Sequence, residues 1–416
     1  MPSTRFADTM LSRRSGRDSG VTDLVFKVSH GAIPPGAVLA GRVPPENRRP
    51  VQEPEQYMRI SHLSQLIAVI LICLMGPGTA SAKDWFPFPV YEVSPPFKAD
   101  GKRTDRTYVA YTSPPSRKWN ICVSIPHLKD AYWLAANFGL VNEAKRLGVS
   151  LTLFQAGGYD KLDTQIRQIE KCLQAGADAL IVSAVSLSGL NETLAEVHSK
   201  GIPIIDLING MSFPDIAARA AADYYDNGFE AGRYIARLNE TGERPVSVLW
   251  FPGPKDAAWA QRGDLGFNDA LKGTNIRILA TKYGDTGKKI QGELVEQAMD
   301  EHPDVDYIVG TTVTAEAAAA LVRRRRLTDR TQVMAYYFGP GVHRGLKRGT
   351  IIAAPTDMPA IMARVSVNQA VRILEKQPYL KHVGSKTIVV DKSNLRSFDL
   401  TTSLAPRGFQ PIFDVN

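Results

Sequence analysis

The sequence predicts an α/β fold of two doubly wound parallel-sheet lobes joined by a hinge. Short apolar runs alternate with segments of helical periodicity, and this alternation occurs as two consecutive series. The chain of 416 residues is also longer than one ordinary hydrophobic core requires. Apolar residues make up 44% and charged residues 22% of the chain, which is typical of a folded globular protein.

The first series begins at Trp119 and alternates four short strands with three helices. Gly148, Gly176 and Gly201 follow the three helices, at positions where the backbone that ends a helix favours glycine. The expected strands are 119–125, 149–154, 179–182 and 204–207, and the expected helices are 131–147, 162–174 and 190–200. Such an alternation is typical of βαβ units, whose strands form a parallel sheet.

A second series of the same kind begins near Gly228. The expected helices are 229–238, 259–271, 290–299, 315–325, 343–347 and 358–374, and the expected strands are 246–251, 276–282, 307–309, 333–336 and 351–354. Ligands of doubly wound sheets bind beyond the carboxyl ends of the strands. Two facing lobes therefore predict a ligand site in the cleft between them.

Residues 58–82 have the order of a secretory signal peptide. Met58 and Arg59 form a short basic start, an apolar stretch runs from 63 to 76, and the small residues 80–82 follow. The apolar stretch of about 14 residues is shorter than the ~20 that a membrane span needs. Cys73 lies inside this stretch after the bulky Ile72, which argues against a lipid anchor. We therefore expect export, cleavage after Ala82 and no membrane anchor.

The segment before this signal, 1–57, is rich in Arg, Pro and Gly and lacks sustained periodicity. We expect it to be a mis-called or disordered extension with Met58 as the true start, and the alternative is a real extended leader. Residues 83–117 are expected to form an irregular N-terminal arm, with room for a short hairpin, packed on the first lobe. The expected lobes are 118–227 with 351–380 for lobe one, and 228–350 with 381–416 for lobe two.

The sequence contains no motif of an enzyme. It lacks the glycine spacing of a dinucleotide site, the Gly-x-Ser-x-Gly elbow and the His-Glu-x-x-His zinc motif. We therefore expect no catalytic residues, no metal and no cofactor. Without residues 1–82 the chain carries 41 basic and 36 acidic residues. This small excess of positive charge does not indicate a surface that binds nucleic acid.

Aromatic residues follow the predicted strands at their carboxyl ends. Asp130, Tyr132 and Trp133 follow the first strand and Tyr159 follows the second. A third group, Asp223, Tyr224, Tyr225 and Asp226, lies at the junction of the two series. In lobe two, Trp259 follows the first strand and Tyr336–Phe338 follow the last. Rings that converge across a cleft attract a methylated amine by about 0.5–2 kcal/mol each. Sugar stacking and simple packing of lobe on lobe are the alternatives.

Several segments of the chain resemble the TorT family of periplasmic binding proteins, which belongs to the type 1, ribose-binding-like superfamily with two Rossmann-like lobes. The segments are 125–134 (IPHLKDAYWL), 155–159 (QAGGY), 169–172 (IEKC), 252–254 (PGP), 310–317 (GTTVTAEA), 344–349 (RGLKRG) and 406–411 (PRGFQP). The similarity runs from Trp119 to the C-terminus. It implies a receptor in the periplasm that binds trimethylamine N-oxide (TMAO) and docks on a membrane sensor histidine kinase of the TorS type, as part of a two-component system.

The resemblance also implies which residues form the ligand-binding wall. It carries over Tyr132, Trp133, Tyr159 and Tyr337, whereas Tyr224 stands where the family is expected to have Trp. The oxide oxygen needs a donor, and Trp133 Nε1–H or a Tyr hydroxyl would supply one. Asp130 would orient that donor or face the trimethyl pole.

The alternative function is the substrate-binding subunit of an ABC importer for a sugar or a small amine. Sugar-binding relatives usually clamp hydroxyls with carboxylates, but the loop Thr311–Thr314 has none. Unpaired hydroxyls are costly to bury, so this absence counts against a sugar, although Arg262 and Asp256 would partly substitute.

Cys122 and Cys172 fall in the first strand and the second helix. In an oxidising compartment such as the periplasm, we expect them to form a disulfide. Closing a loop of ~50 residues would contribute about 4 kcal/mol to stability on the chain-entropy model.

Overall fold

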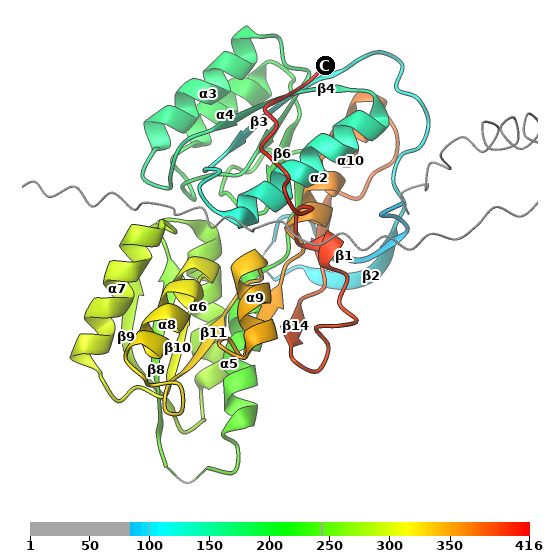
Figure 1. Cartoon of the computed structure of the whole chain (residues 1–416). Coiled ribbons are helices and arrows are strands. Elements are labelled where there is room, and N and C mark those ends of the chain that lie inside the picture. The colour runs from blue at the N-terminus through cyan, green and yellow to red at the C-terminus, as the bar shows by residue number, and fades with distance from the viewer. Residues whose placement is uncertain (1–83, 99, 243) are drawn as a thin grey trace, which may run out of the picture. The chain divides into compact units, whose positions relative to one another are not determined.

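The computed structural model describes residues 84–98, 100–242 and 244–416, and these residues form two α/β lobes (Figure 1). The first lobe is built on a mixed sheet with the strand order β15-β4-β3-β5-β6-β7-β13-β1-β2. Its strands are β1 (Phe88–Ser94), β2 (Lys102–Tyr108), β3 (Asn120–Ile125), β4 (Ser150–Gln155), β5 (Ala179–Val182), β6 (Ile204–Leu207), β7 (Ala218–Ala220), β13 (His382–Ser385) and β15 (Asp414–Val415). The run from β4 to β13 is parallel, and the hairpin β1–β2 and the last strand β15 add antiparallel edges.

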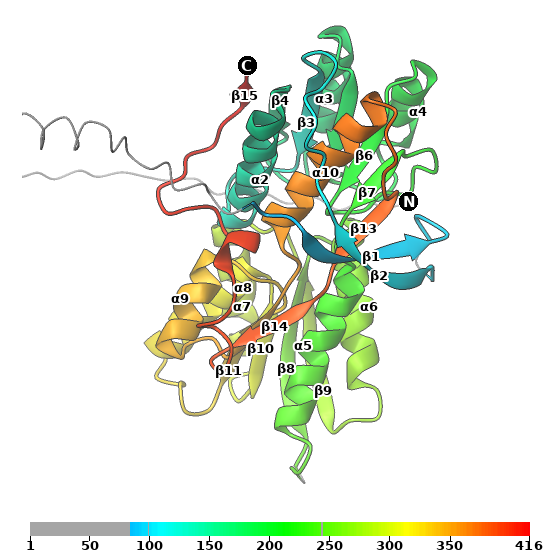
Figure 2. The same ribbon diagram turned by 90° about the vertical axis from the view of Figure 1, so that its right-hand side faces the viewer.

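Two pairs of helices cover the faces of this sheet (Figure 2). Helices α2 (Ala131–Leu147) and α10 (Pro359–Leu374) lie together on one face, and α3 (Leu162–Gln174) and α4 (Asn191–Ser199) cover the other. Helices α2 and α10 approach so closely that a Cβ at Gly139 would lie 2.3 Å from the carbonyl oxygen of Ala360. A larger residue at this glycine would therefore force the two helices apart.

The second lobe has a parallel sheet with the order β11-β10-β8-β9. Its strands are β8 (Val246–Gly253), β9 (Ile276–Tyr283), β10 (Tyr307–Gly310) and β11 (Gln332–Ala335). Helices α5 (Tyr224–Leu238) and α6 (Ala258–Leu271) pack on one face, and α7 (Lys288–Glu301), α8 (Thr312–Arg324) and α9 (Pro340–Arg348) lie on the other side (Figures 1 and 2). A Cβ at Gly228 on α5 would lie 2.0 Å from the carbonyl oxygen of Gly263 on α6, so glycine permits this contact.

The chain crosses between the lobes three times, at 221–223, 357–358 and 386–387. The first crossing joins β7 to α5, the second joins β12 (Ala353–Thr356) to α10, and the third joins β13 to β14 (Ile388–Asp391). Strands β12 and β14 pair with each other as a two-stranded ribbon. A 3-10 turn, η1 (Leu400–Thr402), precedes the tail that carries β15 back to the first lobe.

The prediction of an α/β fold with parallel sheets is confirmed. The assignment of the C-terminal strands to the two lobes differs from the expectation. Residues 381–416 were expected in lobe two, yet β13 lies between β7 and β1 of the first sheet and β15 pairs with β4. Strand β12, expected in lobe one, pairs with β14 instead. Apolar periodicity identifies a strand but contains no information about which distant strand it will pair with, so the sequence alone did not place these elements. The arm before Trp119 contains the hairpin β1–β2, which extends the first sheet.

Cys122 on β3 and Cys172 on α3 are joined by a disulfide, the pair that was expected to bridge. The signal peptide 58–82, its cleavage site and the segment 1–57 lie outside the described residues.

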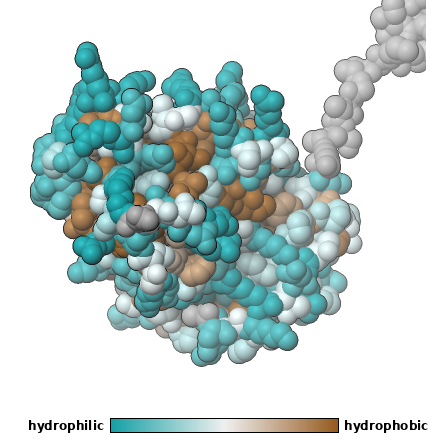
Figure 3. All heavy atoms as spheres, turned by 90° about the horizontal axis from the view of Figure 1, so that it is seen from below, coloured by the Kyte–Doolittle hydropathy of each residue, from teal (hydrophilic) through white to brown (hydrophobic). Residues whose placement is uncertain are grey.

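The surface seen in Figure 3 shows apolar atoms in patches between hydrophilic side chains. Several exposed apolar side chains of the second lobe lie on or beside the edge strand β9: Leu265, Leu279, Tyr283 and Ile290. No helix in the described part of the chain is long and apolar enough to cross a membrane.

Candidate ligand-binding site

A small cavity lies where the carboxyl ends of the strands of both lobes meet. All six residues that were expected to bind ligand line it: Asp130, Tyr132, Trp133, Tyr159, Tyr224 and Tyr337. Asn209, Trp259 and Thr286 complete the wall. We call this space the aromatic cavity. It is narrow in this structure, with a volume of about 10 Å³, which is room for about one water molecule. A larger ligand would therefore have to move the side chains that line it.

The wall is built from the starts of helices and from the loops that follow strands. Tyr132 and Trp133 lie in the first turn of α2, Tyr224 is the first residue of α5, and Trp259 is the second residue of α6. Tyr159 follows β4 and Tyr337 follows β11. Because strand ends and helix starts meet at one edge of a parallel sheet, these residues converge although they are far apart in sequence.

Rings of the two lobes touch one another around the cavity. The ring centroid of Trp259 lies 5.3 Å from that of Tyr224, 5.8 Å from that of Tyr159 and 5.8 Å from that of Tyr337. Tyr132 lies 5.3 Å from Tyr337 and 5.5 Å from Trp133. These separations are those of contacting aromatic rings. The rings therefore pack lobe on lobe and line the cavity at the same time, so the two interpretations of the aromatic residues do not exclude each other.

Trp259 contributes the large ring whose absence at Tyr224 was noted in the sequence. It stands beside Tyr224 in the wall, and its Nε1–H is buried without a hydrogen-bond partner among the described residues. A buried unpaired donor is costly, because it loses the hydrogen bond that it makes with water. The sequence analysis listed this residue among the strand-end aromatics but did not assign it to the site.

Asp357 is a buried carboxylate that the sequence analysis missed. It accepts a hydrogen bond from the hydroxyl of Tyr132, and the Tyr224 hydroxyl lies 2.9 Å from the same oxygen, Oδ2. Oδ1 has no hydrogen-bond partner in the described structure. Burial raises the pKa of Asp357, and the two tyrosine hydroxyls oppose this effect. Its position after β12, at a strand end, is the only sequence signal that pointed to it.

Asp130 has a structural role as well as a place in the wall. It caps α2, since its Oδ1 accepts hydrogen bonds from the backbone N–H groups of Tyr132 and Trp133 at 3.1 and 3.2 Å. Burial raises its pKa to about 6, although these two N–H groups and Lys129 act in the opposite direction. The carboxyl group therefore changes its charge close to neutral pH.

His127 lies behind the wall and is neutral. Its Nε2 is 3.0 Å from the hydroxyl of Thr286, and burial, followed by the charge of Lys129, lowers its pKa to about 3. Asn209 closes the far side of the cavity, where its Nδ2 donates to the hydroxyl of Tyr159 at 3.2 Å. The aromatic cavity is thus lined by rings and by the carboxylate Asp130, with no cationic group among its described lining residues. Asp357 lies outside the wall, against the hydroxyls of Tyr132 and Tyr224.

The residues considered as substitutes for sugar-clamping groups lie outside this wall. Arg262 forms an ion pair with Asp223, at 2.6 Å. Thr311 caps α8 by accepting a hydrogen bond from the N–H of Thr314. The described residues contain no cluster of His, Cys, Asp and Glu that would hold a metal ion.

The fold and the cleft define the class of protein. Residues 121–378 match the family model described as a periplasmic binding protein domain, and the chain belongs to this family. It is similar to the periplasmic protein TorT of Escherichia coli K12, with 34% identity over 299 residues, 71% of this chain and 85% of that relative. The chain is a TorT-like type 1 periplasmic binding protein.

Two solved structures extend the comparison. One is an ABC transporter solute-binding protein from Bradyrhizobium sp. BTAi1 with bound bis-tris, which is 48% identical, covers 80% of this chain and all of its own, and has a TM-score of 0.71. The other is the complex of the TorS sensor domain with TorT in the presence of TMAO. It is 32% identical, covers 71% of this chain and all of its own, and has a TM-score of 0.66.

Proposed function

We propose that this chain is a periplasmic receptor, and not an enzyme, that binds TMAO or a similar methylated amine in the aromatic cavity and signals to a membrane sensor histidine kinase of the TorS type. The complex of TorS with TorT in the presence of TMAO supports the choice of ligand and partner. The names of its relatives support a periplasmic location. Cleavage after Ala82 remains a prediction from the sequence pattern of residues 58–82.

The observation that carries the proposal is the convergence of aromatic side chains on one small cavity from both lobes. Tyr132, Trp133 and Tyr159 come from the first lobe, and Trp259 and Tyr337 come from the second. Ring faces attract the positive pole of a methylated amine by electrostatics, and the attraction is strongest where water is excluded. A ligand with three methyl groups presents that pole in every direction except one.

The remaining direction is the oxide oxygen, which needs a hydrogen-bond donor. Tyr132 and Tyr224 direct their hydroxyls toward Asp357, so their protons are already engaged. Trp259 Nε1–H has no hydrogen-bond partner among the described residues, so it would be available as a donor once a ligand moves the rings that bury it. We therefore assign the oxygen to Trp259 and the methyl groups to the other rings.

Ligand binding reaches the hinge through Asp357. This residue lies in the second crossing, its side chain bonds Tyr224 next to the first crossing, and its carbonyl oxygen accepts from Ser385 Oγ at 2.7 Å beside the third. A ligand shifts the balance between lobe arrangements only by binding them with different affinity. Rings contributed by both lobes provide that difference, because a ligand contacts all of them only when the lobes are together.

A second candidate function is the substrate-binding subunit of an ABC importer for a small amine or a sugar. The Bradyrhizobium relative is described as an ABC transporter solute-binding protein, and its bound bis-tris is itself a tertiary amine. Capture of this protein by the purified periplasmic domain of the TorS-type kinase would favour the receptor. Capture by a permease complex, with no binding to the kinase domain, would favour the importer.

The test of the ligand is calorimetry with TMAO. We expect heat of binding that Trp133→Ala abolishes, because the substitution removes a ring and opens the cavity wall. The matched control is Trp119→Ala, a half-buried tryptophan of the same lobe that lies outside the cavity and hydrogen bonds Glu375. No heat with TMAO or any methylated amine, but heat with a pentose or hexose, would contradict the proposal.

A further inference from the structure

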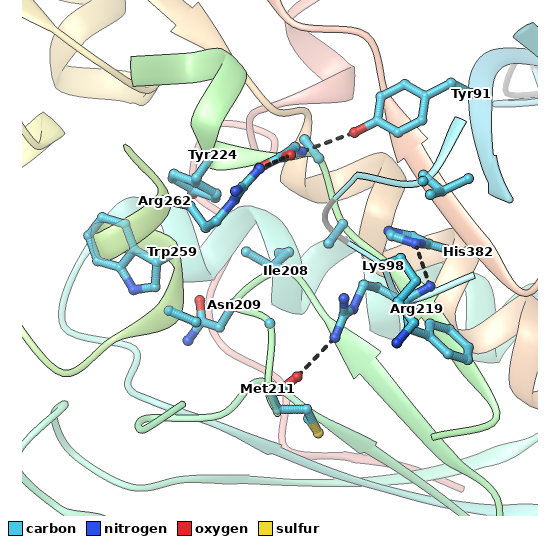
Figure 4. Close-up of a pocket in the computed structure, with 18 of the residues that line it drawn as sticks. Tyr91, Lys98, Ile208, Asn209, Met211, Arg219, Tyr224, Trp259, Arg262 and His382 are labelled. Carbon is cyan, nitrogen blue, oxygen red and sulfur yellow. Dashed lines mark hydrogen bonds and ion pairs between the residues drawn. The ribbon is translucent and has the colours of Figure 1, made fainter. Parts of the chain in front are cut away.

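A second and larger cavity adjoins the aromatic cavity. It lies between the hairpin β1–β2, the loops after β6 and β7, and the start of α6, and its volume is about 180 Å³. We call it the hairpin cavity. It shares Asn209, Tyr224 and Trp259 with the aromatic cavity, so these three residues form the boundary between the two spaces. Figure 4 shows Tyr224, Trp259 and Asn209 on one side of the hairpin cavity and Arg219 and His382 on the other.

The lining of the hairpin cavity is basic. Lys98, Arg103, Arg219 and Arg262 line it, with Asp223 as the one carboxylate among the described lining residues. Arg103 pairs with Asp223 at 2.8 Å and also with Asp226, Arg262 pairs with Asp223 at 2.6 Å, and Arg219 pairs with Asp206 at 2.6 Å. Three carboxylates therefore balance the three arginines. Lys98 has no carboxylate partner in the described part of the chain. The pairs hold the guanidinium groups in place and leave Lys98 as the excess positive charge.

Hydrogen-bond donors also outnumber acceptors in this cavity. A guanidinium has five N–H groups, and the ion pairs of Arg262 use Nε and one terminal nitrogen, so donors remain. His382 accepts the N–H of Phe97 at Nδ1, at 3.2 Å, and is therefore a donor at Nε2. Burial, followed by the charge of Arg219, lowers its pKa to about 3, so the ring is neutral. A space with an excess of donors and positive charge suits an anionic group.

The two adjoining cavities therefore have opposite character. The aromatic cavity has rings and the carboxylate Asp130, which favour a cation, whereas the hairpin cavity has Lys98 and the remaining N–H groups of Arg262, which favour an anion. A single ligand that spans the boundary at Trp259 would need a positive and a negative end. The positive end and the negative end of such a ligand would each lose water and gain contacts with protein groups of the opposite charge.

We propose, resting on the function proposed above, that the hairpin cavity is a second compartment of the ligand site and that the chain binds a zwitterionic methylated amine. Its trimethylammonium group occupies the aromatic cavity, and its carboxylate lies against Lys98, Arg262 and His382. TMAO fills only the first compartment. The class of ligand is a betaine, a quaternary amine that carries a carboxylate on a short chain.

The test is competition calorimetry with matched ligands. The zwitterions are glycine betaine and γ-butyrobetaine, the control for the carboxylate is the methyl ester of glycine betaine, and TMAO reports on the aromatic cavity alone. We expect at least one zwitterion to bind about tenfold or more tightly than the ester, because a charge-assisted hydrogen bond to a partly desolvated arginine or lysine is stronger than one to a neutral ester. Equal affinity of the zwitterions and the ester would overturn the proposal.

Variants of Lys98 add a second, independent measurement. Lys98→Gln should weaken the better zwitterion about threefold and Lys98→Glu about tenfold, with no change for TMAO, since an exposed charge contributes modestly. Lys118→Gln, an exposed lysine that lines neither cavity, is the matched control. A Lys98 variant that weakens TMAO as much as the zwitterion, or weakens neither, would contradict the proposal.

The outcomes separate this inference from the function on which it rests. If TMAO binds and no zwitterion binds better than the ester, the second compartment is wrong and the receptor stands. If no methylated amine binds at all, both are wrong. Independent binding of TMAO and of acetate, without any gain when the two groups are linked, would also overturn the idea of one composite site.

Discussion

The two lobes of this protein differ in the number of edge strands and covalent cross-links that stabilise each one. The first lobe has its sheet extended at both edges, by the hairpin β1–β2 and by β15, and it contains the Cys122–Cys172 disulfide. The second lobe has four parallel strands, contains no cysteine and leaves β9 as an edge with exposed Leu279 and Tyr283. We call the part of the aromatic cavity that the first lobe contributes the wall, and the part that the second lobe contributes the cover.

The same contrast holds within the aromatic cavity. The first lobe contributes Tyr132, Trp133 and Tyr159, with the capping carboxylate Asp130, whereas the second contributes Trp259, Thr286 and Tyr337. If the wall and cover differ in role, substitutions in the first lobe should affect binding of every methylated amine. Substitutions in the second lobe should change the affinity for some ligands and not for others, depending on the chemical group of the ligand that contacts that lobe.

The largest expected effect is the loss of the disulfide that stabilises the first lobe. Replacing both disulfide cysteines, Cys122→Ser with Cys172→Ser, should lower the free energy of unfolding by about 4 kcal/mol, because a closed loop of ~50 residues restricts the unfolded chain. Urea denaturation of the exported protein measures this change. Affinity for TMAO in native conditions should change less than about twofold, because neither cysteine lines the aromatic cavity. An unchanged denaturation midpoint would contradict the contrast between the lobes.

A smaller effect is expected for the cover. Trp259→Phe keeps a ring but removes the Nε1–H donor, and it should weaken TMAO about tenfold, as expected for a hydrogen bond to a strongly polar oxygen. Tetramethylammonium, which has no oxygen, should bind the variant as it binds the parent chain. Calorimetry with the two ligands separates these results. An equal loss for both ligands would show that Trp259 acts only through its ring face.

The smallest expected effect is a pH dependence that originates in the wall. Because the pKa of Asp130 is raised to about 6, its protonated form is favoured by folding. The stability from this group is fully present below its ordinary pKa of 3.8 and is lost as the pH rises through about 6. Tetramethylammonium favours the ionised form, so its affinity should rise about threefold between about pH 5 and pH 7.

Calorimetry across this pH range is the measurement, and Asp130→Asn, which keeps an oxygen to cap α2, is the control. Three titratable groups near Asp130 keep their charge in this range. His127 is neutral, and the tyrosines Tyr159 and Tyr337 have pKa values raised by burial. A pH dependence of affinity that persists in Asp130→Asn and disappears in Asp357→Asn would instead come from the carboxylate of Asp357. A flat profile in the parent chain would contradict the prediction.

Much of the fold was accessible from the sequence, because its signals are local. The helix 131–147 was predicted with the bounds of α2, since helical spacing of apolar residues and a terminal glycine mark it. The wall of the site was accessible for a related reason. Residues that follow strands in a parallel sheet share one edge, so the aromatics after β3, β4 and β11 were expected to meet.

The parts that were not predicted depend on contacts between distant segments. Asp357 follows an unremarkable strand, and its importance arises because Tyr132 and Tyr224 approach it from elsewhere in the chain. The hairpin cavity exists because Lys98 and Arg103 fold back onto the crossings, which no spacing in the sequence specifies. The position of β13 between β7 and β1 is a choice of partner strand, and hydrophobic pattern does not determine it.

That position of β13 has a consequence for the order in which the molecule can be assembled. The hairpin β1–β2 is the first described element to be synthesised, but its neighbour in the sheet, β13, ends only at Ser385. A chain made from its N-terminus therefore carries an unpaired hairpin until almost all of its 416 residues have been produced. The sheet of the first lobe can be completed only after the whole of the second lobe has been synthesised, because β13 follows that lobe in the chain.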